Sequence, residues 1–132
     1  MHYIIAYFAA IIVFFIIDFV WIGTIAREFY KNQIGHLRGV EVNVPAAIMF
    51  YLMYIAGIMI FAVKPALVSG SIKPALIYGA LFGFFCYATY DFTNYATLKN
   101  WPLKMVVVDI TWGIFLTGSV AMAAAWVALK FV

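Results

Sequence analysis

The stretch ALIYGALFGFFCYATYDFTNYATLKNWP, residues 75–102, joins a long apolar run to a polar cluster without a break. A run of about 20 apolar residues is long enough to cross the hydrocarbon core of a bilayer as a helix. The polar part carries Asp91 and Asn94 among threonine and tyrosine residues. We interpret the stretch as a membrane-spanning helix that holds polar side chains near one of its ends.

The composition of the whole chain indicates an integral membrane protein. Of its 132 residues, 68% are hydrophobic and 10% are charged, and the mean hydropathy is +1.08. A soluble domain carries about 25% charged residues, which cover its surface. The net charge of +3 comes from basic residues scattered over the loops, so no nucleic-acid partner is expected. The single cysteine, Cys86, excludes an internal disulfide.

Four apolar stretches are each long enough to span a bilayer. They cover residues 3–24, 44–63, 75–96 and 103–129. The first is long and lacks a positively charged leader, so we expect a retained span and not a cleaved signal. The sequence therefore predicts an all-α protein, an integral membrane four-helix bundle folded as one domain over residues 1–132.

Proline marks the starts of the later spans. It is tolerated in the first turn of a helix because its missing N–H would have no helical partner there. The prolines at these starts are Pro45, Pro74 and Pro102. We expect Lys64-Pro65 to end the second span. The segment IAREFY, residues 25–30, is interpreted as a continuation of the first helix into the headgroup zone.

Three aspartates lie inside the predicted spans, namely Asp18, Asp91 and Asp109. Consecutive spans alternate in direction, so all three fall about 5–6 residues, or roughly 8–9 Å, from the same membrane surface. Charged side chains at such depths are costly and usually face a partner, a cavity or a pathway. We expect these carboxyls to converge on one inward-facing polar site. The loop with Arg27 and His36 emerges on the same side.

Two of the aspartates share a local pattern. Asp18 and Trp21 form one Asp-x-x-Trp motif, and Asp109 and Trp112 form another. Residues at i and i+3 lie on one helical face, and an indole N–H can donate to the carboxylate or to a ligand. The match is interpreted as a packing requirement or coincidence, with a short inverted repeat as the alternative.

Stripes of small residues at four-residue spacing run along the third and fourth spans. One stripe is Gly79, Gly83, Tyr87, Asp91 and Tyr95, and the other is Asp109, Gly113, Thr117, Ala121 and Ala125. Small residues let helix backbones approach closely. We predict helices that pack tightly at one side of the membrane and splay around a polar site at the other. Hydroxyls and an amide at that level are expected from Tyr87, Tyr90, Thr93, Asn94, Thr97 and Thr111.

The segments FYKNQIGHLRG, FYLMYIAGIMIFAVKPAL, YGALFGFFCYATYDFTNYATLKNWPL and VVDITWGIFL carry a resemblance to a known family. Across essentially its whole length, the chain resembles a family of small bacterial four-span membrane proteins that is catalogued only as a domain of unknown function. The resemblance implies a multi-pass protein of the bacterial inner membrane. It implies no reaction.

Three functions are compatible with the polar cluster. We favour binding or transport of a small cationic or amphipathic molecule, or of a proton, because adjacent carboxyls cannot all ionise at low cost and aromatic rings attract cations. The alternative is an interfacial enzyme acting on a lipid or other amphipathic substrate, with aspartates as general acid and base and His36 as a proton shuttle. In the third interpretation the cluster is purely structural, with the aspartates satisfied by Arg27 or Lys104, by threonines, or by one another's protons.

The candidate ligand-binding or proton-carrying residues are Asp18, Trp21, Arg27, His36, Tyr87, Asp91, Asn94, Asp109 and Trp112. The aspartates with His36 are also compatible with a hard divalent metal, but we assign no metal site, no cofactor and no catalytic residue. The expected partners are the lipid bilayer, a small-molecule or lipid ligand and, for a transporter of this size, a second copy of the chain.

The basic residues indicate an orientation in the membrane. The aspartate side carries Arg27, Lys31, Arg38, Lys99 and Lys104, and the other side carries Lys64, Lys73 and Lys130. Because cytoplasmic loops are enriched in basic residues, we expect both termini outside and the aspartates near the cytoplasm.

Overall fold

The protein is a bundle of four helical spans, as predicted. A computed structural model describes residues 2–37 and 43–131. The spans run His2–Ile25, Val44–Ser69, Lys73–Thr97 and Leu103–Phe131, and each is long and apolar enough to cross a membrane. Arg38, which contributes to the predicted orientation, lies outside the described residues.

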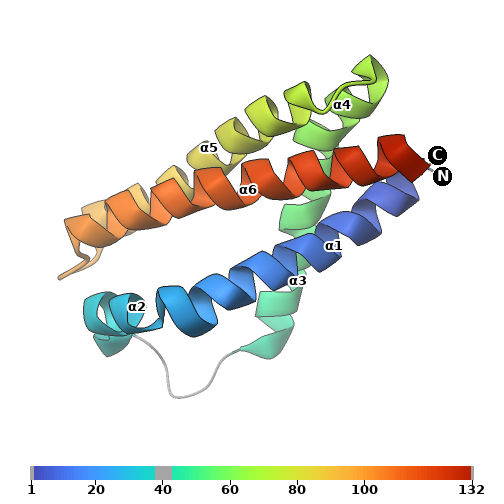
Figure 1. The fold of residues 1–132 in the computed structure, drawn as a ribbon. Coiled ribbons are helices and arrows are strands. Elements are labelled where there is room, and N and C mark those ends of the chain that lie inside the picture. The colour runs from blue at the N-terminus through green and yellow to red at the C-terminus, as the bar shows by residue number, and fades with distance from the viewer. Residues whose placement is uncertain (1, 38–42, 132) are drawn as a thin grey trace.

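The helices are arranged as three neighbours and one that crosses them (Figure 1). Helix α1 (His2–Val20), α5 (Lys73–Thr97) and α6 (Leu103–Phe131) run side by side. Helix α3 (Val44–Ile58) crosses them steeply, and the two chain ends lie together at one end of the bundle. Because α1 starts where α6 ends, these two helices are antiparallel.

Helices α5 and α6 pack through their small residues, which confirms the interpretation of the two stripes. A Cβ placed on Gly79 would lie 2.8 Å from the Ala121 Cβ and 2.9 Å from the Thr117 carbonyl oxygen. A Cβ on Gly83 would overlap the Gly113 carbonyl oxygen. The backbones are therefore close enough that only glycine fits at these positions, as in other membrane helix pairs.

The second span does not end at Lys64-Pro65, so that prediction is wrong. A π-helical turn over Met59–Val63 is followed directly by helix α4 (Lys64–Ser69). The Lys64 N–H donates to the Met59 carbonyl across this wider turn, and Pro65 sits in the first turn of α4. A π-helical turn relieves the clash and the missing donor that proline brings to a helix interior, so the chain stays helical to Ser69.

The first helix does not continue through IAREFY, which corrects the second boundary interpretation. It closes in a π-helical turn over Trp21–Ile25, and Ala26 leaves the helical conformation with φ −104° and ψ 1°. Helix α2 (Arg27–Ile34) then takes a new direction, and a 3₁₀ turn follows over Gly35–Leu37. This bend brings Ala26 and Tyr30 into an apolar cluster with the start of α6.

Candidate functional site

The two Asp-x-x-Trp motifs meet across α1 and α6. The rings of Trp21 and Trp112 stack, with centroids 4.2 Å apart and planes 7° apart. Because the helices are antiparallel, each tryptophan faces the other helix's aspartate region, and the Trp112 indole lies beside the Asp18 carboxyl. The sequence interpretation paired each tryptophan with the aspartate of its own motif. In the structure, each tryptophan is instead associated with the aspartate of the other motif.

A chain of hydrogen bonds connects Trp21 to Asp109 through a residue of α2. The Trp21 Nε1–H donates to the Tyr30 hydroxyl at 2.9 Å, and that hydroxyl donates to Asp109 Oδ1 at 2.9 Å. Burial and then the charge of Asp109 raise the pKa of Tyr30 above its usual range, so the phenol remains a donor. Sequence reasoning missed Tyr30, because only the bend at Ala26 turns it toward the aspartates.

Asp91 is the least exposed of the three aspartates. Its side chain is 0% exposed, compared with 8% for Asp18 and 7% for Asp109. Neither of its oxygens accepts a hydrogen bond within residues 2–37 and 43–131. Its carboxyl is adjacent to that of Asp109 and to the indole of Trp101, whose Nε1 is also buried without a partner in that part of the chain. Asp109 therefore lies between Asp91 and the rest of the site.

A cavity of about 560 Å³ opens beside Asp18 and Asp109. Its polar and aromatic lining residues include Asp18, Tyr51, Tyr54, Tyr87, Asp109 and Trp112. Its other apolar lining residues include Ile22, Ile34, Phe50 and Met105. Every described span and α2 contribute to this lining, whereas Asp91 lies behind it. The cavity is a space of the size that small ligands occupy.

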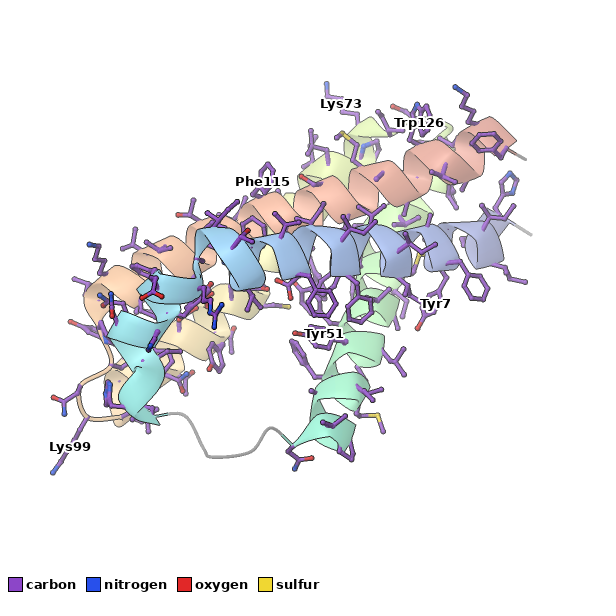
Figure 2. The ribbon with its side chains drawn as sticks, turned by 60° about the horizontal axis from the view of Figure 1, so that its bottom comes forward. Tyr7, Tyr51, Lys73, Lys99, Phe115 and Trp126 are labelled. Carbon is purple, nitrogen blue, oxygen red and sulfur yellow. The ribbon has the colours of Figure 1, made fainter. Side chains whose placement is uncertain are left out.

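The first half of α3 leaves room for this cavity because it diverges from the other helices. Tyr51 projects from α3 toward the neighbouring helices (Figure 2), and its hydroxyl lies 3.5 Å from Asp18 Oδ2. One turn further along, the Tyr54 and Thr117 hydroxyls are 2.7 Å apart and fully enclosed. The bundle is therefore closed on the Lys64 side of Tyr54 and open on the Asn43 side of Tyr51, and the opening is made by α3 and not, as the stripes had suggested, by a divergence of α5 from α6.

The remaining predicted residues are less central. Arg27 is exposed and borders a smaller hollow of about 240 Å³ next to Tyr30. His36 is exposed on the 3₁₀ turn and does not line the cavity. Asn94 is half-buried beside Tyr90. Lys104, considered as a counter-ion, has its ammonium 6.0 Å from the centroid of the Phe29 ring.

Some threonines do not serve the site as expected. The Thr97 hydroxyl donates to the Thr93 carbonyl at 2.7 Å, and the Thr111 hydroxyl donates to the Val107 carbonyl at 2.8 Å. Both side chains are exposed. A threonine on the outside of a membrane helix satisfies its hydroxyl by bonding back to its own helix, so these positions are compatible with lipid.

The metal alternative gains no support from the geometry. Within the two described ranges, no group of three histidine, cysteine, aspartate or glutamate side chains is arranged to hold an ion. Asp91 faces Asp109 and not the cavity, and His36 points elsewhere. The site is better described as carboxyls among aromatic rings than as a ligand sphere.

Comparison with known proteins identifies a family for this chain but no activity. A family model described as "Predicted membrane protein (DUF2177)" matches residues 3–126. No curated protein and no solved structure gives a significant match to the chain.

Proposed function

We propose, for a chain that belongs to the DUF2177 family of predicted membrane proteins, that the cavity binds a small amphipathic cation. The charged group would lie between Asp18 and Asp109, and the apolar part against Ile22, Phe50 and Met105. The observation that carries the proposal is the presence of two buried carboxyls in the lining of an otherwise aromatic and apolar cavity.

The negative charge of the two carboxylates in the lining favours a cation over other ligands. Asp18 and Asp109 are both over nine-tenths buried, and a buried carboxylate is costly unless a positive partner approaches it. The Trp112 Nε1–H lies beside the Asp18 carboxyl and lacks a partner within the described residues, but this group is neutral and does not balance the charge of the carboxylate. An ammonium group would supply the missing positive charge, and the rings of Tyr51, Tyr87 and Trp112 would add cation–π attraction.

The mouth of the cavity suits a ligand that arrives from the lipid. Phe50 is exposed on α3 and Tyr90 on α5, and both border the cavity together with Ile22. In a membrane these side chains would face acyl chains, so an alkyl tail could remain among lipids while its amine reaches the carboxyls. A wholly polar cation would gain nothing from this rim.

Asp91 would hold a proton behind the cavity. An ionised Asp91 would leave both oxygens without a hydrogen-bond partner in the interior. Such a group costs about 1–3 kcal/mol when it is neutral and more when it is charged. A protonated Asp91 can instead donate to Asp109, its neighbour. Of two adjacent carboxyls, one is normally neutral. The site would then present the charges of Asp18 and Asp109 only.

Binding is proposed in preference to chemistry or transport. The enzymatic alternative used His36 as a proton shuttle beside the aspartates, and His36 lies outside the cavity. Transport needs a path to the opposite surface, and the bundle is packed below Tyr54 by residues such as Leu116 and Val120, which are fully buried. A second copy or a helix movement would have to supply that path.

The distribution of basic residues supports an orientation with both termini outside and the aspartates near the cytoplasm. The test is to place the only cysteine at Lys31 or at Ser71 in a Cys86→Ala background and to add a membrane-impermeant maleimide to intact cells. Labelling at position 71 alone is expected. Labelling at position 31 alone would reverse the orientation.

Equilibrium binding tests the proposed ligand class. Purified protein in a maltoside detergent is titrated with decyltrimethylammonium, with 1-decanol and decyl sulfate as neutral and anionic probes of equal chain length, while tryptophan fluorescence is recorded. We expect saturable binding of the cation alone, weakened about tenfold by Asp18→Asn and by Asp109→Asn, which corresponds to about 1.4 kcal/mol. Equal binding of the three probes, or no effect of either substitution, would refute cation recognition.

A further inference from the structure

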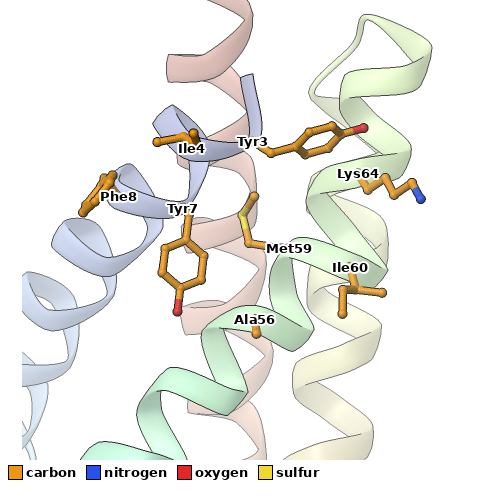
Figure 3. Close-up of a pocket in the computed structure, with 8 residues that line it drawn as sticks. All are labelled: Tyr3, Ile4, Tyr7, Phe8, Ala56, Met59, Ile60 and Lys64. Atoms are coloured by element: carbon orange, nitrogen blue, oxygen red, sulfur yellow. The ribbon is translucent and has the colours of Figure 1, made fainter. Parts of the chain in front are cut away.

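A second hollow lies at the opposite end of the bundle from the aspartates. It has a volume of about 420 Å³ and is bounded by the first turns of α1 and by the end of α3 with its π-helical turn (Figure 3). The residues that line it include Tyr3, Tyr7, Ala56, Met59 and Lys64. None of the residues placed in the polar site contributes to this groove, which is therefore separate from it.

Local structure explains why a groove exists here. Ala56 contributes only a methyl group where α3 passes α1, so the two helices leave space between their larger neighbours. The π-helical turn over Met59–Val63 then shifts the following side chains around the helix axis. Met59 is buried and forms the floor, whereas Lys64 stands exposed at the rim.

The groove lies close to one end of two spans, where lipid headgroups are expected. Tyr3 lies next to the start of the span His2–Ile25, and Lys64 lies near the end of the span Val44–Ser69. Figure 3 shows the Tyr3 ring and the Lys64 side chain reaching toward the same side of the groove. Tyrosine and lysine commonly occupy the membrane interface, where their polar ends meet headgroups.

The charge at this end favours an anionic ligand. Lys64, Lys73 and Lys130 lie at this end, while the acidic residues of the described ranges (Asp18, Glu28, Asp91 and Asp109) lie toward the other end of their helices or on α2. The Lys130 ammonium is 4.6 Å from the Trp126 ring centroid. Lys64 is the basic residue that borders the groove.

We propose that this groove binds a membrane phospholipid with an anionic headgroup. The phosphate would be held by the Lys64 ammonium and the Tyr3 hydroxyl, and the upper part of one acyl chain would lie against Tyr7, Ala56 and Met59. From Lys64 to Ala56 the helix descends about 12 Å at the usual rise per residue, which is a fitting length for that part of a chain. The proposal is independent of the ligand of the aspartate site.

Lipid retention distinguishes this site from general surface charge. The whole protein in maltoside detergent is given equal amounts of dioleoylphosphatidylglycerol and dioleoylphosphatidylcholine, and bound lipids are counted by native mass spectrometry. The wild type should prefer phosphatidylglycerol. Lys64→Gln should reduce that preference about fivefold, which is the usual contribution of one lysine to binding of anionic lipid. Lys73→Gln changes the charge equally but outside the groove, and it should leave the preference intact.

Two further variants complete the test. Ala56→Phe fills the groove without altering charge and should reduce retention of both lipids. Lys64→Arg keeps the charge and should retain the preference even if Lys64→Gln folds poorly. Equal loss from Lys64→Gln and Lys73→Gln, or wild-type protein without a preference, would overturn the proposal. Conversion of a dimer to a monomer by Ala56→Phe would also overturn it, in favour of a second copy as the occupant.

Discussion

Trp21 on the last turn of the first span and Trp112 on α6 stack face to face, with 4.2 Å between their ring centroids and 7° between their planes. The contact joins two identical motifs from antiparallel helices at the level of the aspartates. It sets the separation of α1 and α6 there, and it holds the Trp112 indole beside Asp18. The walls of the cavity therefore depend on this pair.

A double-mutant cycle should detect the stacking energy. Trp21→Leu, Trp112→Leu and the double variant are compared by their free energies of unfolding in detergent. We expect a coupling energy of about 1 kcal/mol, the usual value for an aromatic pair beyond its buried area. The pair Trp21 and Trp126 serves as control, since Trp126 is 47% exposed near the other end of α6 and should show no coupling. Additive effects of the first pair would disprove the contact.

Loss of the Tyr30 hydroxyl should weaken the fold. Tyr30→Phe leaves Asp109 Oδ1 without its donor and the Trp21 Nε1–H without its acceptor, at an expected cost of about 1–3 kcal/mol. Tyr95→Phe is the matched control, because Tyr95 is 47% exposed and should change stability little. The measurement is the free energy of unfolding in detergent. Equal values for the two variants would show that α2 does not anchor to α6 in this way.

Because α5 and α6 pack closely, alanine substitutions at two glycines of their interface should have opposite effects on stability. Gly83→Ala places a Cβ 2.8 Å from the Thr117 Cβ and against the Gly113 carbonyl, whereas the nearest atoms to a Cβ on Gly118 are 3.5 Å away. Overpacking a tight core costs about 1–3 kcal/mol, so Gly83→Ala should lower the melting temperature. Gly118→Ala should leave it equal or higher. A reversed order would mean that the helices face each other in a different register.

Much of this arrangement could be predicted from hydropathy and spacing. A span needs only length and apolar composition, and the four-residue stripe from Gly79 to Asp91 is a direct consequence of helical geometry. The shared depth of Asp18 and Asp109 follows from the alternating direction of the spans. These features depend on one helix or one helix pair at a time.

The missed features depend on contacts between distant segments. Tyr30 reaches Asp109 only because the chain bends at Ala26, and nothing in the local sequence sets the direction of α2. The continuation of the helix past Pro65 depends on the π-helical turn before it. Thr97 and Thr111 were expected at the site since their residue type suits it, but the rotation of each helix turns them outward.

Asp91 should be the protonated member of its pair. In infrared spectra at neutral pH the wild type should show the carbonyl stretch of a neutral carboxylic acid, shifted in heavy water. Asp91→Asn should remove this band and leave the protein folded, because an amide replaces a neutral carboxyl of similar shape. Asp18→Asn is the control and should keep the band. Its persistence in Asp91→Asn would assign the proton to another residue, and unfolding of that variant would favour a purely structural cluster.

The most direct measurement of cation binding in the cavity is photo-cross-linking with mapping of the adducts. A decylamine that carries a diazirine on its chain is irradiated with the protein, and modified peptides are identified by mass spectrometry. Adducts should fall on the cavity wall, at Tyr51, Tyr54, Tyr87 and Met105, and excess decyltrimethylammonium should suppress them. Adducts spread evenly over exposed positions such as Ile12, Ile16 and Phe115, and insensitive to that competitor, would contradict a binding site between Asp18 and Asp109.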